Sequence, residues 1–369
     1  MKFALFSHSV LSDWNHGNAH FLRGVVSELH ERGHDVVIYE PEDAWSAVNL
    51  VADHGEQWLY ATLVEYPSLR VVRYSAAALD LDDVLADADV VIVHEWSSHD
   101  LVRRIGEHHA RGGDYVLLFH DTHHRSVSDA ASMAGYDLSQ YDGVLTFGDV
   151  IRRRYLDRGW TRQAWTWHEA ADTRRFRPIP EVSPDRDLVW IGNWGDEERT
   201  SELREFLIEP VRALGLRATV YGVRYPPSAL DELASAGIEY RGWLANYEVP
   251  AAFARHRVTM HVPRRPYAKL LPGIPTIRPF EALACGIPLV SAPWTDAEGL
   301  FTPGTDFLVA RTGAEMTRQL ESVLTRPDLA ASLARNGRAA IERRHTCAHR
   351  AHELIGIVDR VAMSRRVSA

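Results

Sequence analysis

Short apolar runs alternate with longer amphipathic stretches along almost the whole chain of 369 residues. Apolar runs predict buried strands, and apolar residues spaced three or four apart predict helices. In the first half the expected helices include Ala19–Arg32, Asp100–Arg111 and Asp149–Arg158. The expected strands are Lys2–Ser7, Asp35–Tyr39, Val90–Val93, Tyr115–Phe119, Val144–Phe147 and Gln163–Trp167. This alternation predicts a parallel sheet covered by helices on both faces.

A segment rich in proline and charge, FRPIPEVSPDRD at Phe176–Asp187, separates the two patterned halves and is expected to be a linker. The pattern then restarts. Strands are expected at Leu188–Ile191, Ala218–Tyr221, Ile238–Arg241, Val258–Val262 and Leu289–Ser291. Helices are expected at Thr200–Leu214, Ser228–Ala236, Arg278–Ala284, Gly313–Leu324, Asp328–Arg344 and Cys347–Ala362. The fold class is therefore α/β, with two Rossmann-like domains facing each other, and ligands should bind beyond the carboxyl ends of the strands.

Composition narrows the class of protein. Apolar residues make up 46% and charged residues 25% of the chain, as in ordinary water-soluble proteins. No apolar run approaches the ~20 residues of a membrane span, and MKFALFSHSV is too soon interrupted for a secretory signal. Two cysteines, Cys285 and Cys347, fit neither a disulfide framework nor a zinc motif. We therefore expect a cytoplasmic protein.

Charge argues against a broad surface for nucleic acid, because the formal net charge is −9. The segment RRRYLDRGW, Arg152–Trp160, leaves room for weak peripheral association with a membrane. Basic charge is nearly all arginine, and Lys2 and Lys269 are the only lysines. That bias singles out Lys269 as either a functional residue or a solvated surface lysine.

In the first half, Gly17 and Asn18 follow the first strand and precede a helix. A glycine there lets a ligand approach the backbone, and the free N–H groups of the first turn can hold an anion. A simple helix start explains the same residues.

His120 and Asp121 follow the apolar run Tyr115–Phe119 and should emerge at the carboxyl edge of the sheet. An imidazole there can hydrogen-bond to sugar hydroxyls or transfer a proton, so we predict both residues as catalytic. A purely structural histidine is the alternative. No cysteine or carboxylate stands at ligand spacing from this cluster, so we expect no metal site.

The second half opens with VWIGNWGDEERTSEL. Gly192 and Asn193 lie between strand and helix, and Arg199 lies near the helix start. A flexible loop followed by a guanidinium suits a diphosphate. An exposed arginine among glutamates is the alternative. Gly242 and Trp243 form a further turn after a strand, which suits either the edge of a nucleobase or core packing.

The richest stretch is RRPYAKLLPGIPTIRPFEALACGIPLVS. A helix should begin near Arg278, with Thr276 as its N-cap. Glu281 should then lie in the first turn, where a carboxylate can accept hydrogen bonds from both ribose hydroxyls while helix N–H groups face phosphates. Compensation of the helix dipole is the alternative explanation for Glu281.

Several of these segments resemble motifs of GT-B glycosyltransferases of the family-four kind, and more closely the CgeB-type spore-maturation group. PFEALACGIPLVS is similar to their donor motif through Glu281, Ala282, Ala284, Cys285, Gly286 and Pro288. HEAADTRRFRP (His168–Pro178), IGNW (Ile191–Trp194) and GTDFLV (Gly304–Val309) resemble three further motifs in the same order. The resemblance covers most of the chain and is closest from about Trp167 to Val309.

The resemblance implies a GT-B architecture with an acceptor-side domain at 1–177 and a donor domain at 186–345. It also implies that a helix at 346–363 crosses back to the first domain. A nucleotide diphosphate sugar would be held mainly by the second domain and an unidentified acceptor by the first, with no metal and no cofactor. Carried over by position, Glu281 would hold the ribose, and Gly192, Asn193 and Arg199 the phosphates. Gly17 would lie against the donor and His120 against the transferred sugar.

One position departs from the family pattern. Family-four enzymes usually carry two glutamates eight positions apart, and the position eight before Glu281 is Gly273. Lys269, Thr276 and Arg278 are the candidates to fill that space. The resemblance as a whole implies a metal-independent glycosyltransferase that retains anomeric configuration. A nucleotide-sugar 2-epimerase of the same fold, or a nucleotide-sugar-binding protein without turnover, are the alternatives.

Overall fold

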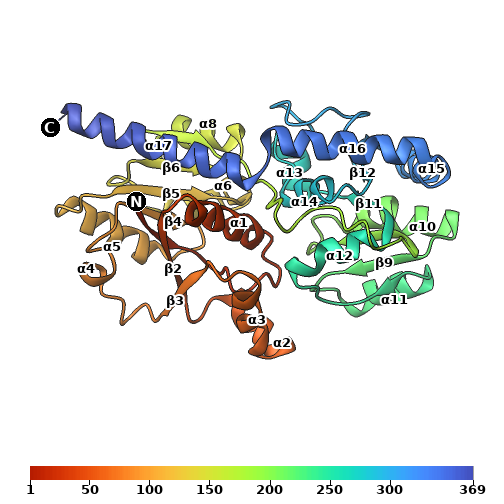
Figure 1. The fold of residues 1–369 in the computed structure, drawn as a ribbon, viewed down its shortest axis with the longest axis horizontal. Coiled ribbons are helices and arrows are strands. Elements are labelled where there is room, and N and C mark those ends of the chain that lie inside the picture. Colours follow the sequence, from red (N-terminus) through yellow and green to blue (C-terminus); the bar gives the residue numbers. More distant parts are fainter. Residues whose placement is uncertain (369) are drawn as a thin grey trace. The chain divides into compact units, whose positions relative to one another are not determined.

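The computed structural model describes residues 1–368, which form two α/β units, each built on one parallel sheet (Figure 1). The first unit consists of Met1–Glu169 together with the last helix, α17 (Cys347–Ser368), and the second of Ala170–Thr346. Every strand pairing within the two sheets is parallel. The predicted fold class of two Rossmann-like α/β domains is therefore confirmed.

The first sheet has seven strands in the order β3-β2-β1-β4-β5-β6-β7. Its strands are β1 (Lys2–Phe6), β2 (Asp35–Pro41), β3 (Arg70–Tyr74), β4 (Val90–His94), β5 (Val116–Asp121), β6 (Gly143–Thr146) and β7 (Ala164–Thr166). The helices between them are α1 (Asn18–Glu31), α2 (Trp45–His54), α3 (Gln57–Glu65), α4 (Leu81–Val84), α5 (His99–Ala110), α6 (Arg125–Ser128), α7 (Ala130–Ala134) and α8 (Asp149–Asp157).

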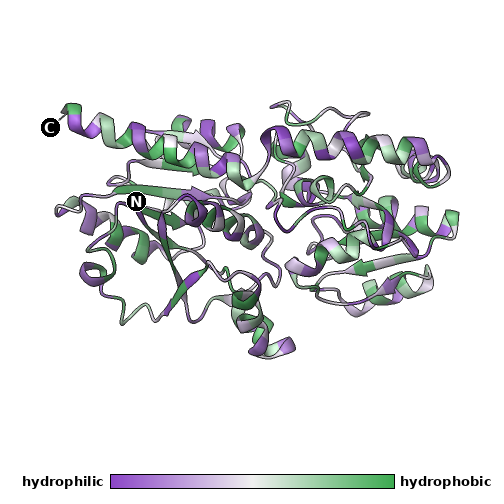
Figure 2. Ribbon diagram, in the orientation of Figure 1, coloured by the Kyte–Doolittle hydropathy of each residue, from purple (hydrophilic) through white to green (hydrophobic). Residues whose placement is uncertain are grey.

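All six strands predicted in the first half are present, but β3 was missed. This strand lies at the edge of the sheet, and its residues RVVRY are exposed or only partly buried. An edge strand lacks the continuous apolar run that marks a buried one, so the hydrophobic pattern did not reveal it. Figure 2 shows the contrast between apolar central strands and helices with hydrophilic outer faces.

The second sheet has six strands in the order β10-β9-β8-β11-β12-β13. Its strands are β8 (Arg186–Ile191), β9 (Ala218–Tyr221), β10 (Glu239–Tyr240), β11 (His256–His261), β12 (Leu289–Ser291) and β13 (Leu308–Val309). Its helices are α9 (Thr200–Leu203), the π-helix η1 (Arg204–Ile208), α10 (Glu209–Leu214), α11 (Pro227–Ser235), the 3-10 helix η2 (Asn246–Glu248), α12 (Val249–Ala254), α13 (Arg265–Leu270), α14 (Ile277–Ala284), α15 (Gly313–Thr325) and α16 (Pro327–Arg344). The single helix predicted over 200–214 is thus divided by a π-helical turn.

Helix α17 packs on the first unit. The Arg365 guanidinium forms an ion pair with Asp142 at 2.6 Å, and the Trp167 indole N–H donates to the Arg350 carbonyl at 2.9 Å. The helix also lies against α1. Helix α17 therefore belongs to the first unit, and its buried residues pack within that unit.

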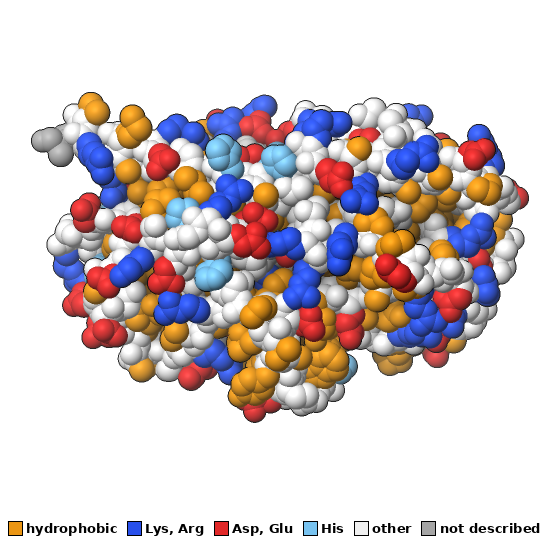
Figure 3. Space-filling view, viewed as in Figure 1, with side chains coloured by type: hydrophobic (Ala, Val, Ile, Leu, Met, Phe, Trp, Pro, Cys, Tyr) orange, Lys and Arg blue, Asp and Glu red, His pale blue; other side chains and the backbone are white. Residues whose placement is uncertain are grey.

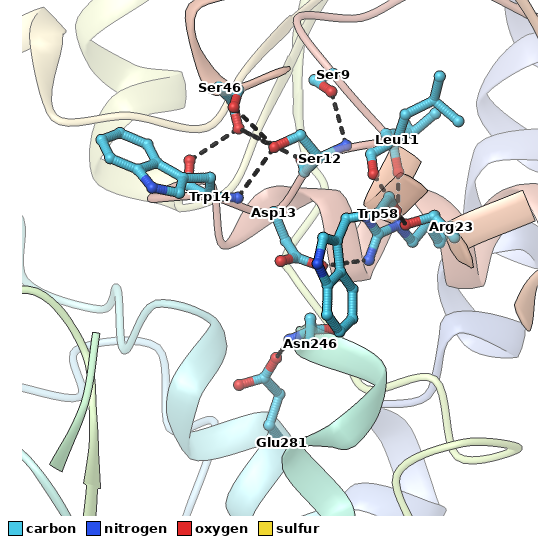
Figure 4. Close-up of polar contacts among 12 residues, drawn as sticks. Ser9, Leu11, Ser12, Asp13, Trp14, Arg23, Ser46, Trp58, Asn246 and Glu281 are labelled. Atoms are coloured by element: carbon cyan, nitrogen blue, oxygen red, sulfur yellow. Dashed lines mark hydrogen bonds and ion pairs between the residues drawn. The ribbon is translucent and has the colours of Figure 1, made fainter. Parts of the chain in front are cut away.

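Two buried charged residues hold the loop after β1, and Figure 4 shows one of them, Arg23, beside Asp13. The Glu40 carboxylate of β2 accepts hydrogen bonds from the Ser9 hydroxyl and the Val10 N–H, both at 2.9 Å. Arg23 of α1 donates to the Val10 carbonyl at 2.6 Å and pairs with Asp13 at 2.8 Å. A loop fixed in this way presents its later residues, up to the start of α1, in a defined position.

The surface of the first unit carries exposed apolar side chains on two of its helices. Helices α2 and α3 carry an apolar patch formed by Val48, Val51, Tyr60 and Val64, visible in Figure 3 as hydrophobic side chains over these helices. Across residues 1–368, no helix is both long and apolar enough to cross a membrane. Peripheral association through Arg152–Trp160 stays a prediction.

The turn after β9 brings Gly222 so close to Gly192 that only a glycine fits there without a backbone shift. Gly222 has a φ of 157°, and a Cβ there would lie 2.0 Å from the Gly192 carbonyl oxygen. We predict that Gly222→Ala destabilises the second unit by about 2–4 kcal/mol, because the backbone must shift. Urea unfolding followed by tryptophan fluorescence measures the change.

The matched control is Gly237→Ala, where φ is 70° but no atom lies within 4 Å of the added Cβ. There only the left-handed backbone penalty of about 1 kcal/mol applies. Equal losses for the two variants would show that the contact with Gly192 does not constrain this turn.

Candidate functional site

Three residues predicted for the phosphate region meet at the carboxyl edge of the second sheet. Gly192 and Asn193 directly follow β8, and Arg199 directly precedes α9. Arg199 Nη2 donates to the Asn193 carbonyl at 2.8 Å and to its side-chain Oδ1 at 2.5 Å. Its guanidinium lies over the Trp190 ring, 5.1 Å from the centroid. A Cβ on Gly195 would come 2.5 Å from Arg199 Cγ, so the glycine leaves room for the arginine.

Arg199 is a cation without a carboxylate partner. Among residues 1–368 its guanidinium bonds only to oxygens of neutral groups, those of Asn193 and the Val262 carbonyl, and its buried Nε has no acceptor. Burial, followed by repulsion from Arg264 and Arg278, lowers the pKa of Arg199 to about 9. Within residues 1–368, Arg199 therefore offers a guanidinium without an ion-pair partner, a group that an anionic ligand can bind.

The two neighbouring arginines are paired. Arg264 forms an ion pair with Glu198 at 2.7 Å, and Arg278 pairs with Glu281 within α14. Arg264 did not emerge from the sequence, because its position in a proline-rich loop gave no periodic signal. The structure brings it to Arg199 because the loop after β11 lies beside the loop after β8, and these strands are neighbours in the sheet.

Glu281 is fully buried and oriented by two side chains. Its Oε1 accepts from Asn246 Nδ2 at 2.7 Å, and its other oxygen accepts from Arg278. Asn246 was missed, since the sequence offered only the preceding Gly242 and Trp243 as a turn. A carboxylate with two donors already in place is fixed in position, and its oxygens are suited to accept hydrogen bonds from hydroxyl groups.

Two local predictions about α14 were wrong. Glu281 is the fifth residue of the helix rather than a residue of its first turn, because the helix begins at Ile277. Thr276 precedes the helix with a φ of 62° and makes no side-chain capping bond. Dipole compensation at a helix start therefore does not explain Glu281, and the hydrogen bond with Asn246 does more to fix its position.

Glu298 lies beside Gly273, the position at which the resembled motif carries its first glutamate. Gly273 has a φ of 98°, and a Cβ there would lie 2.7 Å from Glu298 Oε1. The carboxylate beside this position thus comes from Glu298, which follows β12. Lys269 is exposed on α13. Glu298 could not be found from the spacing, since it is remote from Gly273 in sequence.

The turn after β10 contributes backbone groups and a partly buried indole. Gly242 has a φ of 71°, and its carbonyl accepts from the Gly222 N–H at 2.8 Å. Trp243 is partly buried and follows it directly. The segment leads into Asn246, so the predicted turn reaches the surroundings of Glu281 through that residue.

In the first unit, a row of imidazoles crosses the carboxyl edge of the sheet. His94 and His120 are register partners at the ends of β4 and β5, with ring centroids 5.4 Å apart. His16 continues the row at 6.1 Å from His94, and His8 lies 5.3 Å from His16. Only His120 of these four was singled out from the sequence.

His120 is buried, and both of its ring nitrogens lack a hydrogen-bond partner in the described chain. Burial lowers its pKa to about 3. A neutral imidazole offers one N–H and one lone pair, so it can bind a hydroxyl group in either direction. It is too weakly basic to remove a proton efficiently near neutral pH.

Asp121 is also buried, but the protein occupies its oxygens. Oδ2 accepts from the Tyr155 hydroxyl at 2.9 Å, and Oδ1 accepts from the His123 N–H at 3.0 Å. Burial raises its pKa to about 6. Nearby, Glu95 pairs with Arg125 at 3.1 Å. This arrangement fits Asp121 as a residue that orders the loop after β5.

Gly17 and Asn18 lie at the start of α1, as expected. Gly17 is exposed and is the residue before the helix, and Asn18 is its first residue. Asn18 Nδ2 contacts Glu169 Oε1 at 3.3 Å, while its buried Oδ1 has no partner within residues 1–368. The Ala19 and His20 N–H groups of this first turn donate to the His16 and Gly17 carbonyls, both at 3.3 Å, so these two are not the free N–H groups that the sequence predicted.

Metal ligands are not gathered in the part of the chain that the structure describes: no group of three or more His, Cys, Asp or Glu side chains is arranged to hold an ion. Cys285 and Cys347 are both buried as free thiols.

Comparison with known proteins shows which proteins this chain resembles in sequence and in fold. Residues 199–356 match a family model described as glycosyl transferase-like. No curated protein matches the sequence. The structure is similar to sucrose-phosphate synthase from Thermosynechococcus elongatus, at 13% identity and a TM-score of 0.66, covering 99% of this chain and 100% of that one. It is also similar to Anabaena Alr3699/HepE in complex with UDP and glucose, at 12% identity and a TM-score of 0.67, covering 97% and 99%.

A glycosyltransferase from Rickettsia africae is similar over 98% of both chains, at 11% identity and a TM-score of 0.63. At such identities these structures establish the fold alone. The chain therefore has the GT-B fold of glycosyltransferases, and residues 199–356 carry a glycosyl transferase-like domain. Both findings agree with the resemblance drawn from the motifs.

The buried state of His120 gives a pH-dependent prediction. The folded protein keeps this imidazole neutral to about pH 3, whereas the unfolded chain protonates it near its ordinary pKa of about 6.5. The unfolded state therefore binds more protons between these values, so this histidine contributes less stability as pH falls below about 6.5. The stability of wild type relative to His120→Gln should rise by about 1.4 kcal/mol per unit from pH 5 to 6 and level off above pH 7.

Urea unfolding of the first unit at a series of pH values measures this difference. The exposed His30→Gln serves as the control and should show no comparable trend. A difference for His120→Gln that is constant with pH would mean that the imidazole is accessible to protons in the folded protein.

Proposed function

We propose that the protein is a glycosyltransferase that transfers a sugar from a nucleotide diphosphate sugar to an acceptor hydroxyl. The second unit would bind the donor and the first unit the acceptor. The observation that carries the proposal is Arg199, a partly buried cation without a carboxylate partner in residues 1–368, inside the domain that matches the glycosyl transferase-like model. A diphosphate is the anion that this domain is suited to bind.

The charges support a diphosphate rather than a single carboxylate. Burial lowers the pKa of Arg199, and repulsion from Arg264 and Arg278 acts in the same direction. Only Arg264 and Arg278 have carboxylates beside them. A ligand with two or more negative charges would relieve this repulsion and form charge-assisted hydrogen bonds with guanidinium groups.

Glu281 is proposed to bind the ribose. Asn246 and Arg278 fix its carboxylate, whose oxygens would accept hydrogen bonds from the adjacent hydroxyls of a ribose. Gly242 and Trp243, in the segment that leads to Asn246, are the candidates to contact the nucleobase. We also propose that Glu298 takes the place of the glutamate that Gly273 replaces, on the side of the transferred sugar.

In the reaction, the acceptor oxygen would form a bond to the anomeric carbon as the bond from that carbon to the diphosphate oxygen breaks. The arginines would stabilise the negative charge that develops on the leaving diphosphate, and the acceptor proton would pass to that oxygen. No metal or cofactor is needed in this scheme. His120 would hydrogen-bond to a sugar hydroxyl, which its neutral ring allows.

The finer assignments rest on the motifs. The CgeB-type relationship, the hexose in the donor and the retention of anomeric configuration follow from the resemblance of PFEALACGIPLVS and its companions. They are proposals that product analysis can test.

Donor binding tests the assignment of the site. We predict that Arg199→Ala and Glu281→Ala each weaken binding of the preferred nucleoside diphosphate by about 10-fold or more, because each loses a charged or bidentate hydrogen-bond partner. Isothermal titration calorimetry gives the dissociation constants, and circular dichroism confirms folding. Arg204→Ala, which removes a surface pair with Glu232, is the control and should bind as wild type does. Wild-type affinity in both site variants would exclude the site.

Turnover separates the proposed activity from its alternatives. Incubating the protein with its preferred nucleotide sugar and an acceptor library should release the nucleoside diphosphate in an acceptor-dependent manner. A glycosyltransferase should leave the sugar unchanged when no acceptor is present. Epimerised sugar without acceptor would indicate a 2-epimerase, and tight binding without any conversion would indicate a binding protein.

A further inference from the structure

His261 lies in the donor domain but has no role in the site so far described. It is the last residue of β11, at the carboxyl edge of the second sheet, and is 2% exposed. Its Nδ1 is 2.9 Å from the Ser291 hydroxyl, at the end of the neighbouring β12. Its Nε2 is buried and has no hydrogen-bond partner in the part of the chain that the structure describes.

The hydrogen bonds of Ser291 identify which nitrogen of His261 carries the proton. The Ser291 hydroxyl donates its single hydrogen to the Ala292 carbonyl at 2.8 Å. The oxygen of Ser291 must therefore accept from His261, so Nδ1 carries the hydrogen. In the neutral ring, Nε2 is then a lone-pair acceptor directed away from β12.

The surroundings of His261 keep the ring neutral. Burial, and after it the positive charges of Arg199 and Arg278, lower its pKa to about 3. Protonation would place a third cation beside these two arginines. Because the neutral ring carries its hydrogen on Nδ1, Nε2 cannot donate to a phosphate oxygen. A phosphate oxygen placed there would meet the lone pair of Nε2.

We propose that His261 Nε2 accepts a hydrogen bond from a hydroxyl group of the sugar in the donor, and so helps to select that sugar. This inference rests on the proposed function. A buried acceptor without a donor is unfavourable, and a hydroxyl is the donor that a nucleotide sugar offers once its phosphates lie on the arginines. The ribose hydroxyls are assigned to Glu281, which leaves the hydroxyls of the transferred sugar for His261.

A ligand must displace a side chain to reach this atom, because Nε2 has almost no exposed surface. The Trp294 ring lies edge-on beside the imidazole, with centroids 6.5 Å apart, and is itself only partly buried. Trp294 belongs to the same segment as Glu298, which lies against Gly273. This segment, 292–298, therefore places an indole and a carboxylate on the side that we assign to the sugar.

The same strand provides a matched control. His256 begins β11 and also has a buried Nε2 without a partner in residues 1–368, while its Nδ1 lies 2.6 Å from the Ala252 carbonyl. It differs from His261 in lying at the amino end of the strand, away from the edge where ligands of such sheets bind. A general effect of removing a buried histidine should therefore appear in both variants, and a specific effect only in His261.

The test compares binding of a nucleoside diphosphate with binding of its glucose conjugate, using the nucleobase that wild type prefers. His261→Phe removes the acceptor, and His261→Gln replaces the imidazole with an amide that retains one. We predict that His261→Phe weakens binding of the sugar conjugate about 10-fold more than binding of the diphosphate, and that His261→Gln has a smaller effect. His256→Phe should leave the ratio of the two dissociation constants unchanged. Calorimetry measures each constant.

An unchanged ratio of the two dissociation constants in His261→Phe, whether or not both ligands bind more weakly, would overturn the role of His261 while leaving the proposed function intact. Failure of wild type to bind any nucleoside diphosphate would instead contradict the proposed function, and this inference with it. If His261→Phe does not fold, His261→Leu, which also removes the acceptor, is compared with His256→Leu and decides in the same way.

Discussion

The fold depends on one constraint: strands of a parallel sheet that are buried on both faces carry mostly apolar side chains, and their ionisable side chains lie mainly near the strand ends. In the first unit, the apolar core of β4 and β5 gives way to His94, His120 and Asp121 at the last positions. In the second, β11 and β12 end in His261 and Ser291. Parallel pairing then brings these chain-distant residues together at one edge of each sheet. Candidate chemistry is thereby confined to two edges.

The two edges differ in their electrostatics. The edge of the first sheet holds imidazoles that burial keeps neutral, and its charged groups are mostly paired, as Glu95 is with Arg125. The edge of the second sheet holds three arginines, of which Arg199 has no ion-pair partner among the described residues. Neutral imidazoles on one unit and an unpaired guanidinium on the other match the division between acceptor and diphosphate donor that we propose.

Much of the fold could be predicted from sequence because buried strands and amphipathic helices have distinct periods. The edge strand β3 and the π-helical turn within 200–214 could not, since neither disturbs the apolar pattern in a recognisable way. At the site, residues next to strands or in a motif were within reach, such as Arg199 and Glu281. Asn246, Arg264, His261 and Glu298 were not, because their relevance comes from neighbours that only the folded sheet brings near. For Thr276 the residue type was misleading. It lies at the N-cap position of α14, but its φ is 62° and its side chain makes no capping hydrogen bond.

The central claim is that Arg199 and the two arginines beside it, at the edge of the second sheet, bind the diphosphate of a nucleotide sugar. The most direct measurement is a thermal-shift series with a nucleoside, its monophosphate, its diphosphate and its diphosphate sugar, for each common nucleobase. Stabilisation should be negligible for the nucleoside, rise sharply at the diphosphate, weaken with added salt and disappear in Arg199→Ala. Equal shifts for nucleoside and diphosphate, or an unchanged series in Arg199→Ala, would contradict the account.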